Sequence, residues 1–159
     1  MVKKIMILTL VIVCMTITLV ASVEPVEAEQ TPSPDKLFAY ESYQGEYHWY
    51  YYTLKDYECD MDLITMLSIA RLETGNFTSD AYVNGHNWGG ISINEKPLVY
   101  ESEEDGVIAF VNLMQSYYDK GLRTPEEIGK KYCPINSEWS NLVKKIMNEE
   151  QNNIQVRWE

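Results

Sequence analysis

Residues 61–91 read MDLITMLSIARLETGNFTSDAYVNGHNWGGI, and this stretch decides the fold class. Its first half carries apolar residues at helical spacing and predicts a helix over residues 61–74. The residues on its apolar surface are Leu63, Met66, Leu67 and Ala70, with Ile64, Ile69 and Leu72 beside them. We expect Asp60 to cap the start of this helix and Gly75 to end it. An apolar surface wider than one stripe indicates a helix that is buried on most sides.

Glu73 lies at the end of this predicted helix, on the same flank as Ile69 and Ala70. Residues three and four positions apart share a helix face, so we expect the carboxyl to be partly shielded from water. Shielding disfavours the charged form and raises the pKa of a carboxyl, as a general acid working near neutral pH requires. The spacing is also compatible with a structural carboxylate that pairs with Arg71 or caps the turn at Gly75.

Three further helices are predicted downstream. The sequence Ser102-Glu103-Glu104-Asp105 resembles a capping box and opens a helix that runs to Gly121. The sequence Thr124-Pro125-Glu126-Glu127 opens a short helix with Pro at its first position. Ser137 is expected to start a last amphipathic helix. Its inward residues are Trp139, Leu142, Val143, Ile146 and Met147.

The remaining segments add one hairpin and one ambiguous region. Residues 84–100 hold several glycines and the sequence Asn94-Glu95-Lys96-Pro97, which together predict a small hairpin. Residues 37–57 are rich in aromatic side chains, which suit either a core or a surface that stacks on sugars. A helix ending near Lys55 is the favoured interpretation there. The expected fold class is therefore mainly α (α+β), with a small β hairpin as a flap.

Residues 1–28 have the layout of a secretory signal peptide. Lys3 and Lys4 precede an apolar run over residues 5–20, and small residues follow it. Cleavage after Ala28 is favoured, with Ala21-Ser22 as the other position. An uncleaved membrane anchor is the alternative, because the apolar run approaches the length that spans a bilayer.

Residues 29–36 are polar and contain Pro, which predicts a linker without a core of its own. The folded domain is then expected over residues 37–159. We expect a monomer that is secreted or held at the cell surface. Its contact with the membrane is expected only through the N-terminal signal or anchor.

The charge of the chain argues against a nucleic-acid partner. The formal net charge is −11, and removing residues 1–28 leaves it unchanged because two lysines and two glutamates go together. Phosphate binding depends on clustered Lys and Arg, which an acidic chain does not favour. Recognition of a substrate is therefore expected to use stacking and hydrogen bonds.

Neither a metal nor a cofactor is expected. The acidic residues 56–62 lack the Gly and the terminal Glu of a calcium loop, and His48 and His86 do not have zinc spacing. Cys59 and Cys133 remain after removal of the signal peptide. An oxidising exterior would permit a disulfide between them, and two separate thiols are the other possibility.

Two blocks after the predicted helix resemble a family motif. Glu73-Thr74-Gly75 and the following residues 86–91 are similar to peptidoglycan hydrolases of the glucosaminidase family, the family 73 glycoside hydrolases. In that family a helix ends in a catalytic Glu within an E-[ST]-G pattern, and an Asn-Asn-x-x-Gly-[IV] stretch follows. Here His86 stands where the family has its first Asn, and either side chain can donate a hydrogen bond.

The resemblance continues downstream and covers roughly residues 63–146. Tyr100-Glu101-Ser102 resembles the Tyr-x-Ser that follows the family's flap, and residues 124–128 resemble its T-x-x-x-I segment. Tyr132 corresponds to a family Tyr that lines the cleft.

The resemblance implies a lysozyme-like helical domain that cleaves the N-acetylglucosamine and N-acetylmuramic acid strands of bacterial peptidoglycan, with Glu73 as general acid. It also implies that substrate-binding residues surround this carboxyl. These are Asn87, Trp88, Gly90, Tyr100 and Tyr132. Glycines let a backbone approach a ligand closely, and an Asn can hydrogen-bond an acetamido group. From the residues alone, the same loop could be a tight turn that supports the flap, and the tyrosines could be ordinary core residues.

The identity of a second catalytic carboxylate is open. Glycosidases that use two carboxylates hold them about 5–5.5 Å apart for retention and about 6.5–9.5 Å apart for inversion. The short flap offers Glu95, and Asp80 and Glu101 are the other candidates. Lysozyme-like lytic transglycosylases manage with a single Glu. Hydrolysis, transglycosylation and non-catalytic wall binding are therefore all compatible with the sequence.

Overall fold

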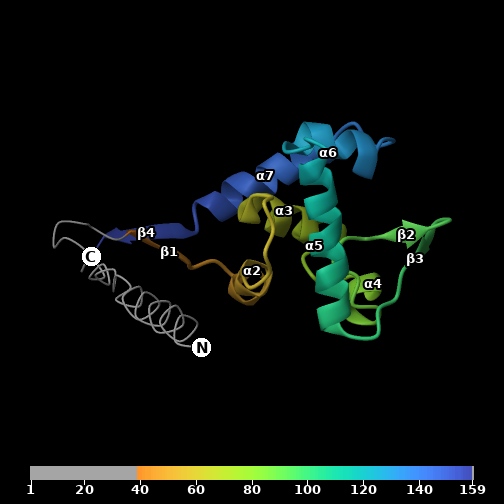
Figure 1. The fold of residues 1–159 in the computed structure, drawn as a ribbon, viewed down its shortest axis with the longest axis horizontal. Coiled ribbons are helices and arrows are strands. Elements are labelled where there is room, and N and C mark those ends of the chain that lie inside the picture. The colour runs from red at the N-terminus through yellow and green to blue at the C-terminus, as the bar shows by residue number, and fades with distance from the viewer. Residues whose placement is uncertain (1–38, 159) are drawn as a thin grey trace, which may run out of the picture. The chain divides into compact units, whose positions relative to one another are not determined.

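The computed structural model of the protein describes residues 39–158. Within this range the chain is mainly helical and carries two small antiparallel sheets, so the expected mixture of helices with a little β structure is confirmed (Figure 1). None of the helices in the described range is long and apolar enough to cross a membrane. The predicted signal peptide or anchor and the predicted linker lie outside the described residues.

Along residues 39–158, three helices follow the first strand, two short strands come next, and three more helices precede the last strand. The helices are α2 (His48–Lys55), α3 (Leu63–Glu73), α4 (Asp80–Val83), α5 (Glu103–Asp119), α6 (Pro125–Tyr132) and α7 (Trp139–Gln151). The strands are β1 (Ala39–Tyr43), β2 (Ser92–Ile93), β3 (Lys96–Pro97) and β4 (Ile154–Trp158). Strand β1 pairs with β4, and β2 pairs with β3.

Helix α3 is buried on most of its surface, as its broad apolar pattern predicts: every residue from Ile64 to Ala70 is buried. Its start differs from the prediction. Asp62 is the N-cap, and its Oδ2 accepts a hydrogen bond of 2.8 Å from the backbone N–H of Thr65. Asp60 lies too early in the chain for that bond and instead interacts with the side chain of Gln115. The predicted end is confirmed, because Gly75 directly follows the C-cap with a positive φ of 57°.

Helices α5 and α6 begin where their capping residues predict. The hydroxyl of Ser102 accepts a hydrogen bond of 3.1 Å from the N–H of Asp105. Thr124 and Glu127 form a complete capping box at the start of α6, with Pro in the first turn. Gly121 follows the C-cap of α5 with a φ of 79°, so the predicted end is also confirmed.

Helix α7 begins differently from the prediction. Its N-cap is Glu138 rather than Ser137. The side-chain oxygen of Asn136 accepts the N–H of Glu138 at 3.0 Å, so an Asn two residues upstream provides the local polar contact that Ser137 was expected to give. Trp139 and Val143 are buried as predicted, whereas Leu142 is 42% exposed and does not face the core.

The hairpin is confirmed in a tighter form than predicted. Ser92 pairs with Pro97, and Ile93 pairs with Lys96. The turn therefore consists only of Asn94 and Glu95, whose φ values are 51° and 64°. Two successive positive φ values characterise the two-residue turns that match the twist of a hairpin.

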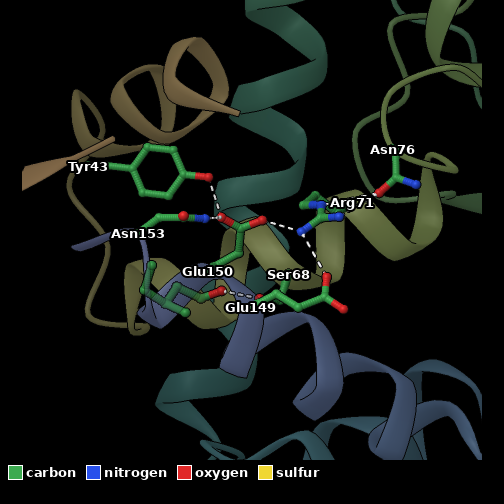
Figure 2. A network of polar contacts seen from close by, with 8 residues as sticks. Tyr43, Ser68, Arg71, Asn76, Glu149, Glu150 and Asn153 are labelled. Atoms are coloured by element: carbon green, nitrogen blue, oxygen red, sulfur yellow. Dashed lines mark hydrogen bonds and ion pairs between the residues drawn. The ribbon is translucent and has the colours of Figure 1, made fainter. Parts of the chain in front are cut away.

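The sheet formed by β1 and β4 is not predicted by the sequence pattern, and it joins the two ends of the described range. A buried polar cluster lies beside it (Figure 2). Glu150, near the end of α7, is 1% exposed and accepts hydrogen bonds from the hydroxyl of Tyr43, the guanidinium of Arg71 and the amide of Asn153. Figure 2 shows the Arg71 side chain reaching the carboxyls of both Glu149 and Glu150. This cluster connects β1 and α3 to the end of α7.

Most aromatic residues of the N-terminal region form core rather than a sugar-stacking surface. The rings of Tyr50 and Phe77 stack with centroids 3.5 Å apart, and Tyr82 and Trp88 pack around them edge-on. Trp49 is the exception, with 55% exposure. The expected helix ending at Lys55 is present as α2. Cys59 and Cys133 are both free thiols, so the disulfide is not formed.

Candidate functional site

Glu73 is the last residue of α3, and its carboxyl is partly buried against α7. The indole Nε1 of Trp139 donates a hydrogen bond of 2.6 Å to Glu73 Oε1. Burial raises the pKa of the Glu73 carboxyl above its ordinary value, and the indole donor opposes part of this rise. The shielding expected from the spacing of the sequence is therefore present.

The second carboxyl oxygen of Glu73 faces the loop between α4 and β2. An ideal Cβ placed on Gly90 would lie 2.8 Å from Glu73 Oε2, so only hydrogen separates the Gly90 backbone from this oxygen. Gly90 has a φ of 59° and is exposed. The structure thus places the predicted catalytic residue next to one predicted substrate-binding residue.

Tyr132 closes the other side of this arrangement. Its hydroxyl donates a hydrogen bond to the carbonyl oxygen of Gly89, and its ring stacks on Trp139 with centroids 5.3 Å apart. Burial raises the pKa of Tyr132, and the nearby Glu73 carboxylate raises it further. Tyr132 therefore connects Trp139, which donates to Glu73, with the loop at Gly89 that lies next to Glu73.

A cavity of about 230 Å³ lies on this loop. It is lined by Gly89, Gly90, Ile91, Ser92, Leu113, Tyr117 and Tyr132. Gly90 lines the cavity and also lies next to Glu73 Oε2, whereas Glu73 itself is not one of the lining residues. The walls combine two tyrosines with peptide groups and a hydroxyl, a mixture that can stack on a sugar ring and hydrogen-bond its substituents.

No protein-family model matches this chain, and no curated protein matches it either. The likeness to family 73 glycoside hydrolases therefore rests on the motifs quoted above. The residues around Glu73 and their geometry carry the functional inference.

Asn87 and Trp88 do not line the cavity, contrary to their predicted role in binding substrate. Asn87 is 1% exposed, and its side chain is fully used by the hairpin: Nδ2 donates to the carbonyls of Ile91 and Leu98, and Oδ1 accepts the N–H of Ile91. Trp88 is 0% exposed and lies in the aromatic core. Neither side chain is accessible to a ligand in this structure. We therefore infer that both support the loop and do not contact a ligand.

Glu103 is a supporting residue that the sequence does not single out. It lies in the first turn of α5 and accepts hydrogen bonds from Tyr82 Oη at 2.8 Å and from Trp88 Nε1 at 2.7 Å. His86 Nδ1 lies 3.1 Å from its other oxygen. An acidic residue directly after a helix N-cap is expected to interact favourably with the positive end of the helix dipole. Only the fold shows that Glu103 also holds the loop between α4 and β2.

Helix α5 approaches this loop very closely. An ideal Cβ on Gly106 would lie 1.8 Å from the carbonyl oxygen of His86, so a side chain at this position would push the loop away. His86 itself has a φ of 50°, which turns the chain toward the loop that borders Glu73. His86, which stands where the glucosaminidase motif has its first Asn, thus lies in a tight turn, and its side chain contacts Glu103.

Tyr100 is partly buried near the same site. Its backbone N–H donates to the carbonyl of Gly85 at 2.9 Å, which closes the segment that carries the hairpin. Burial raises the pKa of Tyr100, and its side chain contributes to the raised pKa of Tyr132. Tyr100 is therefore close to the wall formed by Tyr132, although it does not line the cavity itself.

The three candidates for a second carboxylate are all exposed: Asp80, Glu95 and Glu101. Asp80 accepts a hydrogen bond from Asn84 next to it on the surface, and Glu95 occupies the turn of the hairpin. The influences on the pKa of Glu73 are burial and the indole of Trp139, and neither is a charged side chain. No cluster of three metal-ligating side chains occurs in residues 39–158.

Proposed function

We propose that this protein is an exported, lysozyme-like glycosidase that cleaves the glycan strands of bacterial peptidoglycan, with Glu73 as the general acid. The observation that carries the proposal is the environment of the Glu73 carboxyl. It is partly buried, has a raised pKa, and directs Oε2 toward Gly90, which lines a cavity. A carboxyl whose pKa is raised by burial, and which lies next to a residue that lines a cavity, is suited to act as a general acid.

The proposed reaction begins with proton transfer from Glu73 to the glycosidic oxygen. The bond from this oxygen to the anomeric carbon breaks, and positive charge develops on the sugar ring. Water then attacks the anomeric carbon in hydrolysis, whereas one of the substrate's own groups attacks it in transglycosylation. In both reactions the attacking water or substrate hydroxyl loses a proton as its oxygen bonds to the anomeric carbon, and the Glu73 carboxylate takes up that proton and is restored to the acid form.

The cavity walls suit a neutral sugar better than a charged ligand. Tyr117 and Tyr132 offer aromatic surface, and the backbone of Gly89 and Gly90 offers polar groups beside it. The chain is strongly acidic, so attraction of an anionic wall polymer by charge is not part of the proposal. Export to the cell wall follows from the signal-like N-terminal sequence and is part of the same proposal.

A lytic transglycosylase is the second candidate function, and one observation favours it. Asp80, Glu95 and Glu101 are exposed, and within residues 39–158 the pKa of Glu73 responds to burial and to the indole of Trp139. A single-carboxylate mechanism needs no partner for Glu73, so this arrangement is compatible with trapping of the cation by the substrate itself.

The proposal is tested with purified peptidoglycan and three proteins: wild type, Glu73→Gln and Glu95→Gln. General acid catalysis contributes about 10²–10⁴-fold, so Glu73→Gln should lose cleavage by about that factor. Glu95→Gln should remain active if no second acid acts from the hairpin. Turbidity and released ends give the rates, and mass spectrometry separates reducing glucosamine ends, reducing muramic ends and anhydro-muramic ends.

Equal rates for wild type and Glu73→Gln would exclude the enzyme. Binding to sedimented peptidoglycan by both proteins would then identify a non-catalytic wall-binding protein. Loss of activity in Glu95→Gln would instead assign the second carboxylate to the hairpin turn and favour hydrolysis.

A further inference from the structure

We propose that Trp139 is a positioning residue for Glu73: its indole N–H holds Oε1 and thereby places the acidic proton on Oε2, the oxygen that faces Gly90. This inference rests on the proposed function and adds a residue that the motif resemblance does not include. Trp139 lies 66 positions from Glu73 in the sequence, on a different helix.

The chemistry of the two groups determines the location of the proton. An indole N–H donates a hydrogen bond and cannot accept one. The Glu73 oxygen facing Trp139 must therefore act as the acceptor, both when the carboxyl is charged and when it is neutral. In the neutral form the carbonyl-like oxygen accepts and the other oxygen carries the proton. Oε2 is that other oxygen, and it faces Gly90, which lines the cavity.

The indole is held firmly enough to have this effect. Trp139 is 2% exposed, and its ring stacks on Tyr132. Gly129 on α6 lies against the indole of Trp139. An ideal Cβ at position 129 would lie 2.9 Å from the indole ring, so the absence of a side chain lets α6 pack directly on the ring. Packing on two sides leaves the N–H little freedom to point elsewhere.

The other titratable groups around this site are Tyr132 and Cys133 at the end of α6, Tyr117 on α5, and Tyr100 before α5. Tyrosine and cysteine side chains are ordinarily neutral at pH 7. A pH response between the acidic and neutral range is therefore assigned to Glu73. The indole donor stabilises the charged carboxylate, so its removal raises the pKa of Glu73 further.

The test uses the full-length protein and the variant Trp139→Phe, which keeps an aromatic ring but lacks the N–H. Activity on peptidoglycan requires protonated Glu73, so the alkaline limb of the pH profile should move to higher pH. The value of kcat should fall about three- to tenfold, because one hydrogen bond no longer orients the acid. KM should change little. Trp49→Phe is the matched control, because Trp49 is exposed and does not line the cavity.

A second measurement does not depend on activity or on the folding of a variant. The indole ¹⁵N–H signal of Trp139 in the wild-type protein should shift with pH as Glu73 titrates, and the shift should be absent in Glu73→Gln. A pH-independent signal in an active enzyme would overturn the role of Trp139 alone. An unmoved alkaline limb in folded Trp139→Phe would do the same. Inactive wild-type protein would overturn the proposed function, and the role of Trp139 with it.

Discussion

The backbone of Gly90 lies directly against the carboxyl of Glu73, so that an ideal Cβ at position 90 would be 2.8 Å from Oε2. The positive φ of 59° at Gly90 brings the chain into this position. Two separate demands thus fall on one residue, because the backbone needs a left-handed conformation and the acid needs the space of the missing side chain. The two demands can be separated by experiment.

Gly90→Ala should lose both stability and activity. The left-handed backbone costs an alanine about 1 kcal/mol, and the new methyl displaces Glu73 Oε2, which should reduce peptidoglycan cleavage by about a hundredfold. Gly121→Ala is the matched control, since Gly121 has a φ of 79° and an ideal Cβ there meets nothing within 4 Å. Chemical denaturation and turbidity assays should show a similar loss of stability in both variants and a loss of cleavage only in Gly90→Ala. Normal cleavage by Gly90→Ala would contradict the role of Oε2 as the oxygen that donates the proton.

Asn87 is predicted to hold the hairpin rather than a ligand. Asn87→Ala leaves the carbonyls of Ile91 and Leu98 and the N–H of Ile91 without their partner, so it should destabilise the protein by about 3 kcal/mol. Hydrogen exchange at the Ile91 amide should become much faster. Asn84→Ala serves as the control, because Asn84 bonds only the exposed Asp80 and its loss should change stability by less than about 0.5 kcal/mol. Unchanged protection at Ile91 in Asn87→Ala would contradict this role.

Local signals in the sequence predict much of the fold because the interactions that create them span only a few residues. Thr124 and Glu127 cap their helix through bonds three positions apart, and Gly75 ends α3 through its own backbone conformation. Capping by Ser137 is wrong for the same local reason, since a competing Asn136 two residues before the N-cap makes the polar contact. Periodicity also identifies α3 as a buried helix, and with it the shielded position of Glu73.

Contacts between distant segments could not be predicted. The bond from Trp139 to Glu73 depends on how α7 packs on α3, and no spacing rule encodes it. Hydropathy does not distinguish a tryptophan that stacks on a ligand from one that fills a core, so the burial of Trp88 emerges only with the fold. Glu103 is likewise an ordinary helix-start acid until Trp88 and Tyr82 are seen to donate to it.

The buried and exposed glutamates at the end of α7 should differ sharply in their effect on stability, although both interact with Arg71. Glu150→Gln weakens a nearly completely buried ion pair and should cost about 3 kcal/mol or more. Glu149→Gln is the control, because its carboxylate lies 3.6 Å from the same guanidinium and its side chain is 50% exposed. Exposed pairs contribute about 0–1 kcal/mol, so this variant should unfold almost as the wild type does. Equal losses in the two variants on thermal denaturation would contradict the burial of Glu150.

Glu73→Gln should make the protein more stable at neutral pH, although it strongly reduces cleavage. Burial raises the pKa of Glu73 in the folded chain above its value in the unfolded chain. Between these two values the folded state binds more protons than the unfolded state, so stability is greatest below the unfolded pKa and falls as pH rises through the folded pKa. Glutamine has no charge to bury and avoids this loss, while its side-chain oxygen still accepts the indole N–H of Trp139.

The expected gain is about 1 kcal/mol at neutral pH, typical of replacing an active-site group whose environment suits catalysis better than stability. It should shrink toward zero near pH 4, where the carboxyl of the wild type is protonated in the folded state. Thermal melting of both proteins across this pH range measures the difference. Glu95→Gln is the control, because it makes the same change of side chain at an exposed position in the hairpin turn. If the wild type and Glu73→Gln had parallel stability profiles, the folded chain would not be desolvating this carboxyl, and the main support for Glu73 as a general acid would be lost.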